Sequence, residues 1–357
     1  MGIEVTREMV LEALSKVQEP ELHKDLVSLG MVKDIVIEGN RVTFTIELTT
    51  PACPLRDQIK NEASEVVLAL PEVSEVEVNL EASVPVDSQA GAQGSIRNVV
   101  AIASGKGGVG KTTVAVNVAV ALAQSGACVG LLDADIYGPN VPTMMGVHQI
   151  PPPNEKKIVP AEAHGVKVMS IGFLVPPDQP LIWRGPMLHS AIQQFINDVE
   201  WGELDYLIVD LPPGTGDAQL SLGQSVPLTG GIIVTLPQRV SLEDARRGLE
   251  MFRTMNVPIF GVVENMSYLE LPDGSQVDVF GQGGGQSLAE ETGVAFIGEV
   301  PMDPTLPHTG DDGVPIVISN PDLKSAKSLI AIAEALAAKI SVKSIKGRDT
   351  IQVEMID

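Results

Sequence analysis

The hydrophobic pattern of the chain changes near residue 96. Before that point, "VKDIVIEGNRVTFTIELT" alternates apolar and polar residues around Gly39-Asn40, which predicts two strands joined by a hairpin turn. Helical periodicity precedes this pair at about 6–18, ending before Pro20, and follows it at about 55–70. "VSEVEVNLEA" predicts one more strand. Residues 1–85 are therefore expected to form a small, acidic α+β domain.

From residue 96 onward, short apolar runs replace the alternation. Between several of them lie helical stretches such as "TTVAVNVAVALAQSG" and "SLEDARRGLEMFRTMN". Buried parallel strands that alternate with helices predict a doubly wound, mostly parallel α/β sheet over 96–340. The predicted strands are "NVVAIAS", "CVGLLDAD", "DYLIVDLP", "GGIIVTLP", "VPIFGVVEN" and "AFIGEV".

The remaining segments carry weaker patterns. Residues 86–95 are rich in Ser, Gln, Ala and Gly, which is the composition of a linker. Residues 147–182 are rich in proline and are expected to be loop. A last helix is expected at about 322–340, followed by a tail over 341–357 whose "DTIQVEMID" suggests one more strand.

Composition narrows the function classes. A net charge of −22 argues against a broad nucleic-acid surface. Two cysteines far apart in sequence form no disulfide framework, and they fit a reducing compartment. The opening "MGIEVT" matches a myristoylation pattern, but Thr6 is better interpreted as a helix cap. We expect a cytoplasmic protein without a signal sequence or a membrane span.

The strongest motif lies between a predicted strand and a predicted helix. "GKGGVGKT" from Gly105 to Thr112 fits the phosphate-loop pattern G-x-x-x-x-G-K-[ST]. In that pattern backbone N–H groups surround the phosphates, Lys111 reaches their terminal oxygens, and the hydroxyl of Thr112 binds Mg²⁺. The expected ATP-binding residues are Gly105, Lys106, Gly107, Gly108, Val109, Gly110, Lys111, Thr112 and Thr113.

Carboxylates end two of the predicted strands. Asp133 and Asp135 lie in "LLDADIYGPN", and Asp210 ends "LIVD" ahead of a glycine-rich segment. An NTPase needs such groups to orient the attacking water and to hold the water shell of Mg²⁺. We expect Asp133 and Asp210 in the second shell of the metal. The predicted catalytic residues are Lys106, Lys111, Asp135 and Asp210.

Together these segments resemble the deviant Walker-A family of dimeric ATPases. In that family the extra lysine, here Lys106, crosses a dimer interface to the partner's nucleotide, so the resemblance implies a homodimer. "LLDADIYGPNVPTMMG", "WRGPM" and "ENMSY" resemble the Mrp/Nbp branch of ATP-dependent iron–sulfur cluster carriers, in which Asn265 matches the position that contacts adenine. "EPEL", "LVSLGMV" and "TTPACP" resemble iron–sulfur assembly factors. The implied partners are apo client proteins and assembly factors.

The sequence departs from that branch in its cysteines. Many of its members carry a C-x-x-C pair after "ENMSY", where this chain has "LELPDGSQVDVFGQGGG". Because thiolates are the usual ligands of these clusters, Cys53 is a candidate ligand, with a purely structural role as the alternative, and a [4Fe-4S] cluster bound there is expected to be labile. Cys53 precedes Pro54 at the start of a helix, where the helix dipole lowers a thiol pKa. Cys128 is expected to be a small buried residue within a strand.

Several alternatives stay open at this stage. The chain could be a nucleotide-gated scaffold without its own cluster, or a positioning ATPase of the MinD or ParA type. The acidic composition and a last helix that is neither strongly basic nor terminal argue against the positioning role. Asp217 fits a second switch or a helix cap, and Arg184 fits a phosphate contact or a loop anchor. Trp183 and Trp201 are expected to be packing residues.

Overall fold

The computed structural model describes residues 5–85, 95–136, 138–153, 157–174, 185–216, 219, 223 and 226–354. The chain divides into two compact units. The first comprises Met1–Pro85 and Ala337–Asp357, and the second comprises Val86–Leu336. No helix among the described residues has both the length and the apolar character that a membrane crossing requires.

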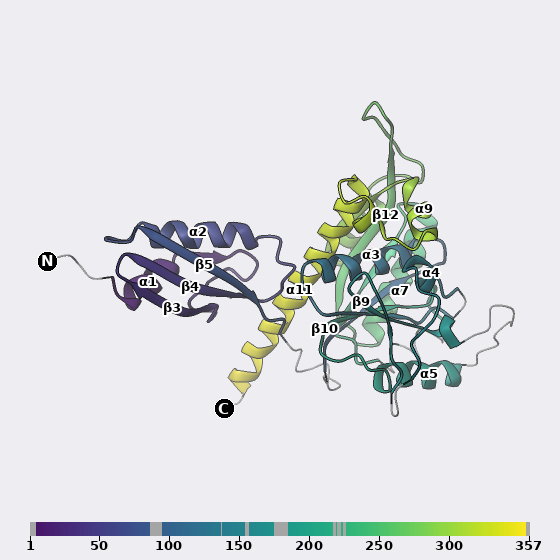
Figure 1. The fold of residues 1–357 in the computed structure, drawn as a ribbon. Coiled ribbons are helices and arrows are strands. Elements are labelled where there is room, and N and C mark those ends of the chain that lie inside the picture. The colour runs from purple at the N-terminus through teal and green to yellow at the C-terminus, as the bar shows by residue number, and fades with distance from the viewer. Residues whose placement is uncertain are drawn as a thin grey trace. The chain divides into compact units, whose positions relative to one another are not determined.

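Residues 5–85 of the first unit contain the expected three-stranded sheet and two helices, together with a short antiparallel pair, β1 and β2 (Figure 1). β3 and β4 form the antiparallel hairpin around Gly39, whose φ is +62°, and β5 lies parallel to β4 with α2 as the crossover. Thr6 caps α1 by accepting a hydrogen bond from the N–H of Met9 at 3.4 Å. The elements are α1 (Arg7–Leu14), β1 (Gln18–Glu19), β2 (Lys24–Asp25), β3 (Val32–Glu38), β4 (Arg41–Leu48), α2 (Arg56–Leu68) and β5 (Glu75–Ala82).

The second unit contains a sheet with the strand order β13-β12-β11-β6-β10-β7-β9-β8, and β14 also pairs with β12. All six strands predicted after residue 96 are present in it, and they pair in parallel. The strands are β6 (Ile96–Ser104), β7 (Val129–Asp133), β8 (Ala161–Ala163), β9 (Val166–Ser170), β10 (Leu204–Asp210), β11 (Gly230–Thr235), β12 (Ile259–Glu270), β13 (Gln276–Val277) and β14 (Phe296–Met302).

Helices cover both faces of this sheet, as a doubly wound fold requires. Val99, Ala101 and Ala103 of β6 belong to a core that includes side chains of α5 and α7. None of the buried residues of α3 belongs to that core, so α3 packs on the face to which Val100 and Ile102 point. The helices are α3 (Lys111–Gln124), α4 (Val141–Met144), η1 (Ile171–Leu174), α5 (Gly185–Asn197), α7 (Arg239–Thr254), α8 (Gly284–Thr292), α9 (Thr305–Asp311), α10 (Ile316–Ser319) and α11 (Lys324–Glu354).

Two expectations about irregular segments are wrong. The stretch 147–182 contains β8 and β9, and β9 joins the main sheet beside β7. These strands are too short for a periodic signal to stand out among prolines. The tail is helical and not a strand, because α11 continues to Glu354 and is therefore close to the end of the chain. The segment 341–354 contains one glycine and no proline, so nothing in it stops a helix.

Candidate functional site

The phosphate loop joins β6 to α3 and requires glycine where it turns. Gly110 has a φ of +82°, and a Cβ added there would lie 2.1 Å from Nδ2 of Asn265. That same Nδ2 donates a hydrogen bond to the carbonyl oxygen of Val109 at 2.8 Å. A side chain at 110 would therefore displace the strand β12 residue that braces the loop. Asn265 therefore lies against the loop, and its expected contact with adenine stays a prediction.

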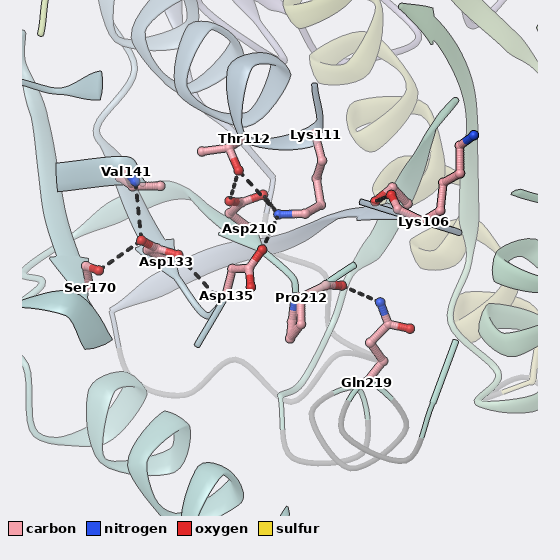
Figure 2. Close-up of polar contacts among 11 residues, drawn as sticks. Lys106, Lys111, Thr112, Asp133, Asp135, Val141, Ser170, Asp210, Pro212 and Gln219 are labelled. Carbon is pink, nitrogen blue, oxygen red and sulfur yellow. Dashed lines mark hydrogen bonds and ion pairs between the residues drawn. The ribbon is translucent and has the colours of Figure 1, made fainter. Parts of the chain in front are cut away.

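Lys111 lies between two carboxylates. Its Nζ is 2.6 Å from Oδ1 of Asp210 and 3.4 Å from Oδ2 of Asp135 (Figure 2). The hydroxyl of Thr112 donates to Oδ2 of Asp210 at 2.7 Å. These groups come together because β10 lies between β6 and β7, which brings the carboxyl ends of the three strands side by side. The structure thus unites four residues that the sequence placed in one site.

Asp133 organises the segment that carries Asp135. Fully buried, its carboxylate accepts hydrogen bonds from the N–H of Asp135 at 3.1 Å, the N–H of Val141 at 3.3 Å and the hydroxyl of Ser170 at 2.9 Å. Burial, together with the charge of Asp210, raises the pKa of Asp133 to about 8. Ser170 was missed from the sequence because it ends β9, inside the stretch interpreted as loop.

The carboxyl group of Asp210 is fully buried and therefore poorly solvated. Burial raises the pKa of this carboxyl, and the ammonium of Lys111 acts in the opposite direction. A hydroxyl and carboxylates around a deep loop are hard oxygen donors of the kind that Mg²⁺ binds, directly or through its waters. Thr112, Asp133 and Asp210 therefore fit the predicted magnesium site by their chemistry. Within the described residues, no set of three or more His, Cys, Asp or Glu side chains is arranged to hold a metal by itself.

A cavity of about 920 Å³ opens over the phosphate loop. The loop, Asp135 and Asn265 line one part of it. Another part of the lining comes from the end of β14 and the segment after it, which no motif indicated: Pro301, Met302, Asp303, Pro304, Leu306, Pro307, Gly310 and Asp311. Phosphate-binding groups together with apolar side chains such as Met302 and Leu306 suit a nucleotide.

Lys106 lines the cavity but does not join the Lys111 cluster. Figure 2 shows its side chain pointing away from Lys111 and Asp210. Its carbonyl oxygen accepts a hydrogen bond from the Ser104 hydroxyl at 2.9 Å, whereas its ammonium has no hydrogen bond or ion pair among the described residues. The two lysines of the loop therefore have different surroundings.

Cys128 is not placed as expected, whereas Cys53 precedes α2 as predicted. Cys128 is exposed and precedes β7, with its N–H donating to Oδ2 of Asp205 at 2.9 Å, so the prediction of a buried strand residue is wrong. The residue falls at the boundary of the apolar run, where the chain enters the sheet. Cys53 is half-buried beside the core of the first unit. It lies in the turn ahead of α2, whose N-cap is Leu55, and not in the first turn of the helix.

Three residues singled out in the sequence, Trp183, Arg184 and Asp217, lie outside the described residues. Trp201 is described and is a packing residue as predicted. Its side chain is buried, and its Nε1 donates to the carbonyl oxygen of Phe195 at 2.8 Å.

Two different family models match the two parts of the chain. The family model described as NUBPL iron-transfer P-loop NTPase matches residues 95–337, and the model described as iron-sulfur cluster assembly protein matches residues 7–80. An iron-sulfur cluster carrier protein of Synechocystis is 54% identical over 352 residues, which cover 96% of this chain and 99% of that protein. A chloroplastic Fe-S cluster assembly factor of Arabidopsis thaliana is 45% identical and covers 87% of this chain and 60% of its own length.

Solved structures agree on the fold of the second unit. A nucleotide-binding protein of Archaeoglobus fulgidus, solved in complex with ADP, has a TM-score of 0.56 and 36% sequence identity, covering 64% of this chain and 91% of that protein. The cell division ATPase MinD of Pyrococcus furiosus, at 22% identity and a TM-score of 0.50, covers 67% of this chain and 97% of its own, and it shows the fold alone.

Proposed function

Because this chain belongs to the family of iron-transfer P-loop NTPases, we propose that it binds and hydrolyses ATP and uses the cycle to carry iron–sulfur clusters to apoproteins. The observation that carries the proposal is the grouping of Lys111, Thr112, Asp135 and Asp210 under one cavity. The choice of an iron–sulfur cluster as the cargo is supported by the names of the relatives, which are cluster carriers and assembly factors that match most of the chain.

We propose separate tasks for the residues of the site. Lys111 holds the terminal phosphate oxygens once they draw its ammonium from the carboxylates. Asp135 orients the attacking water, whose oxygen bonds to the γ-phosphorus as the bond to the bridging oxygen breaks, giving ADP and phosphate. Thr112, with Asp133 and Asp210 in the second shell, would hold Mg²⁺. The metal ion would supply positive charge to the phosphate oxygens.

Lys106 would complete the site of a second copy. Its ammonium points away from its own Lys111 and has no partner among the described residues, which supports a contact made outside its own chain. We propose a homodimer in which Lys106 reaches the partner's phosphates and offsets charge in the transition state, as an arginine finger does. Hydrolysis would then depend on dimer formation.

The cluster is cargo, and Cys53 is its proposed ligand. Two Cys53 thiolates per homodimer fall short of the four that such clusters usually have. We propose that the cluster, of the [4Fe-4S] type, is held weakly, with the remaining positions taken by small thiols or by the client. Weak retention suits transfer. The two cysteines, which form no disulfide framework, support a cytoplasmic setting.

Anaerobic reconstitution tests this proposal. Wild type, Cys53→Ser and Cys128→Ser would be compared by bound iron and by visible charge-transfer bands. The exposed Cys128 is a demanding control, since access alone would favour it. We expect Cys128→Ser to load like wild type and Cys53→Ser to lose its cluster. The reverse result would reassign the ligand, and no cluster in any form, with ATPase activity intact, would support a scaffold without its own cluster.

A further inference from the structure

An arm formed by residues 268–279 continues β12 beyond the rest of its sheet (Figure 1). Leu269 and Glu270 pair antiparallel with Val277 and Gln276 of β13, and all residues from 271 to 279 are exposed. The arm begins beside the nucleotide cavity, because Asn265 and Met266 line that cavity. The arm contains no cysteine.

One face of the arm is apolar although it is exposed. The register places Leu269 opposite Val277, and Leu271 follows on the same face because side chains alternate along a strand. The exposed fractions are 38% for Leu271, 42% for Val277 and 46% for the nearby Val279. Exposed apolar groups gathered on one small element mark an interaction surface.

The arm also ends the sheet. β13 is the first strand of the sheet order, and among the described residues no further strand pairs with its outer edge. Unpaired backbone groups on such an edge can accept an added strand from another polypeptide. An extended segment with apolar side chains on one face would match both the edge and the apolar face.

Charge determines what kind of polypeptide fits. Between Arg253 and Lys324 the sequence has no lysine or arginine and eleven Asp or Glu residues. Asp273 and Asp278 are exposed on the arm itself, and Lys324 already pairs with Glu270. Two copies of an arm that carries Asp273 and Asp278 and no lysine or arginine would repel each other, which argues against a second copy of this chain.

We propose that the arm is a docking surface for a partner polypeptide that adds an extended, lysine- or arginine-bearing segment to the edge of β13. The apolar face contributes burial, the edge contributes backbone hydrogen bonds, and the acidic side chains select a basic partner. The proposal depends only on the surface of the arm and requires neither cluster binding nor hydrolysis.

Two synthetic peptides test it on the full-length protein. One alternates valine with lysine, the other alternates valine with glutamate, and fluorescence anisotropy measures the binding of each. We expect the lysine peptide to bind, and Gln276→Lys with Asp278→Lys to weaken it about fivefold or more by removing attraction and adding repulsion. The same double variant should bind the glutamate peptide better than wild type does. It leaves the turn contact between Asp273 and Ser275 unchanged.

A matched pair of valine substitutions tests the apolar face. Val277→Thr keeps the β-branched shape and should weaken binding of the lysine peptide. Val36→Thr, at a similarly exposed valine on β3, should leave that binding unchanged. Equal binding of both peptides to wild type, or unchanged binding in the arm variants, would overturn the proposal. So would arm variants that abolish self-association while leaving peptide binding intact, since the occupant would then be a second copy.

Discussion

The Nζ of Lys111 lies 2.6 Å from Oδ1 of Asp210, and both side chains are almost completely buried. This pair links the residue that would bind phosphate to the carboxylate at the end of the neighbouring strand. Its consequence is that the phosphate-binding lysine also neutralises charge inside the protein. ATP must therefore compete with Asp210 and Asp135 for the same ammonium.

The stability of the protein should depend on this pair. Lys111→Ala leaves the Asp210 carboxylate buried without its cation and should lower the free energy of unfolding by about 3–5 kcal/mol in the absence of ATP. Adding Asp210→Asn removes the buried, unpaired charge and should recover part of the lost free energy of unfolding. Urea denaturation measures both. Equal stability of the single and double variants would show that Lys111 does not compensate that charge.

ATP affinity and turnover should separate between Lys111 and Asp135. Lys111→Ala removes a direct phosphate contact, so both nucleotide affinity and hydrolysis should fall. Asp135→Ala should keep affinity close to that of wild type and slow hydrolysis about a hundredfold or more, because it removes the group that orients water. Equilibrium binding and single-turnover assays distinguish the two. An equal loss of affinity in both variants would contradict this division.

The bracing of the phosphate loop by Asn265 can be tested with two glycines of the same loop. Gly110 and Gly108 have φ values of +82° and +79°, but an added Cβ meets Asn265 only at Gly110, whereas at Gly108 it meets nothing within 4 Å. Each alanine substitution should lower the free energy of unfolding by about 1–2 kcal/mol, because alanine disfavours the left-handed backbone conformation. Gly110→Ala should cost clearly more, as measured by thermal unfolding. Equal costs would mean that the Asn265 contact contributes nothing.

The sequence predicted the phosphate loop and its carboxylates because each follows a strongly apolar strand. The pairing of β10 with β7 then places Asp210 beside Asp133. Such a pairing between distant strands cannot be predicted from the local sequence pattern. Ser170 and the cavity wall after β14 were missed because they carry no motif and reach the site only through the tertiary fold. Cys128 was misplaced because an apolar run does not show where burial begins. The extension of α11 was missed because the sequence marks no clear end for the helix after residue 340: the segment 341–354 has no proline.

Lys106 should act across a dimer. Mixing Lys106→Ala with Asp135→Ala protein forms hybrid dimers, in which one of the two composite sites retains both residues. ATPase activity should return to a fraction of the wild-type rate. Exchange of subunits, verified by a fluorescent label on each variant, is the control. A mixture that exchanges subunits and stays inactive would exclude a role in trans.

The most direct test of an ATP-driven carrier is cluster transfer itself. Reconstituted wild type would be mixed anaerobically with the apo form of a small [4Fe-4S] ferredoxin, and cluster arrival would be followed by visible circular dichroism with and without ATP. We predict that ATP changes the transfer rate several-fold, about 1 kcal/mol in the barrier, in wild type and not in Asp135→Ala, which binds ATP but hydrolyses it slowly. A transfer rate that ATP leaves unchanged in wild type would contradict the proposed coupling.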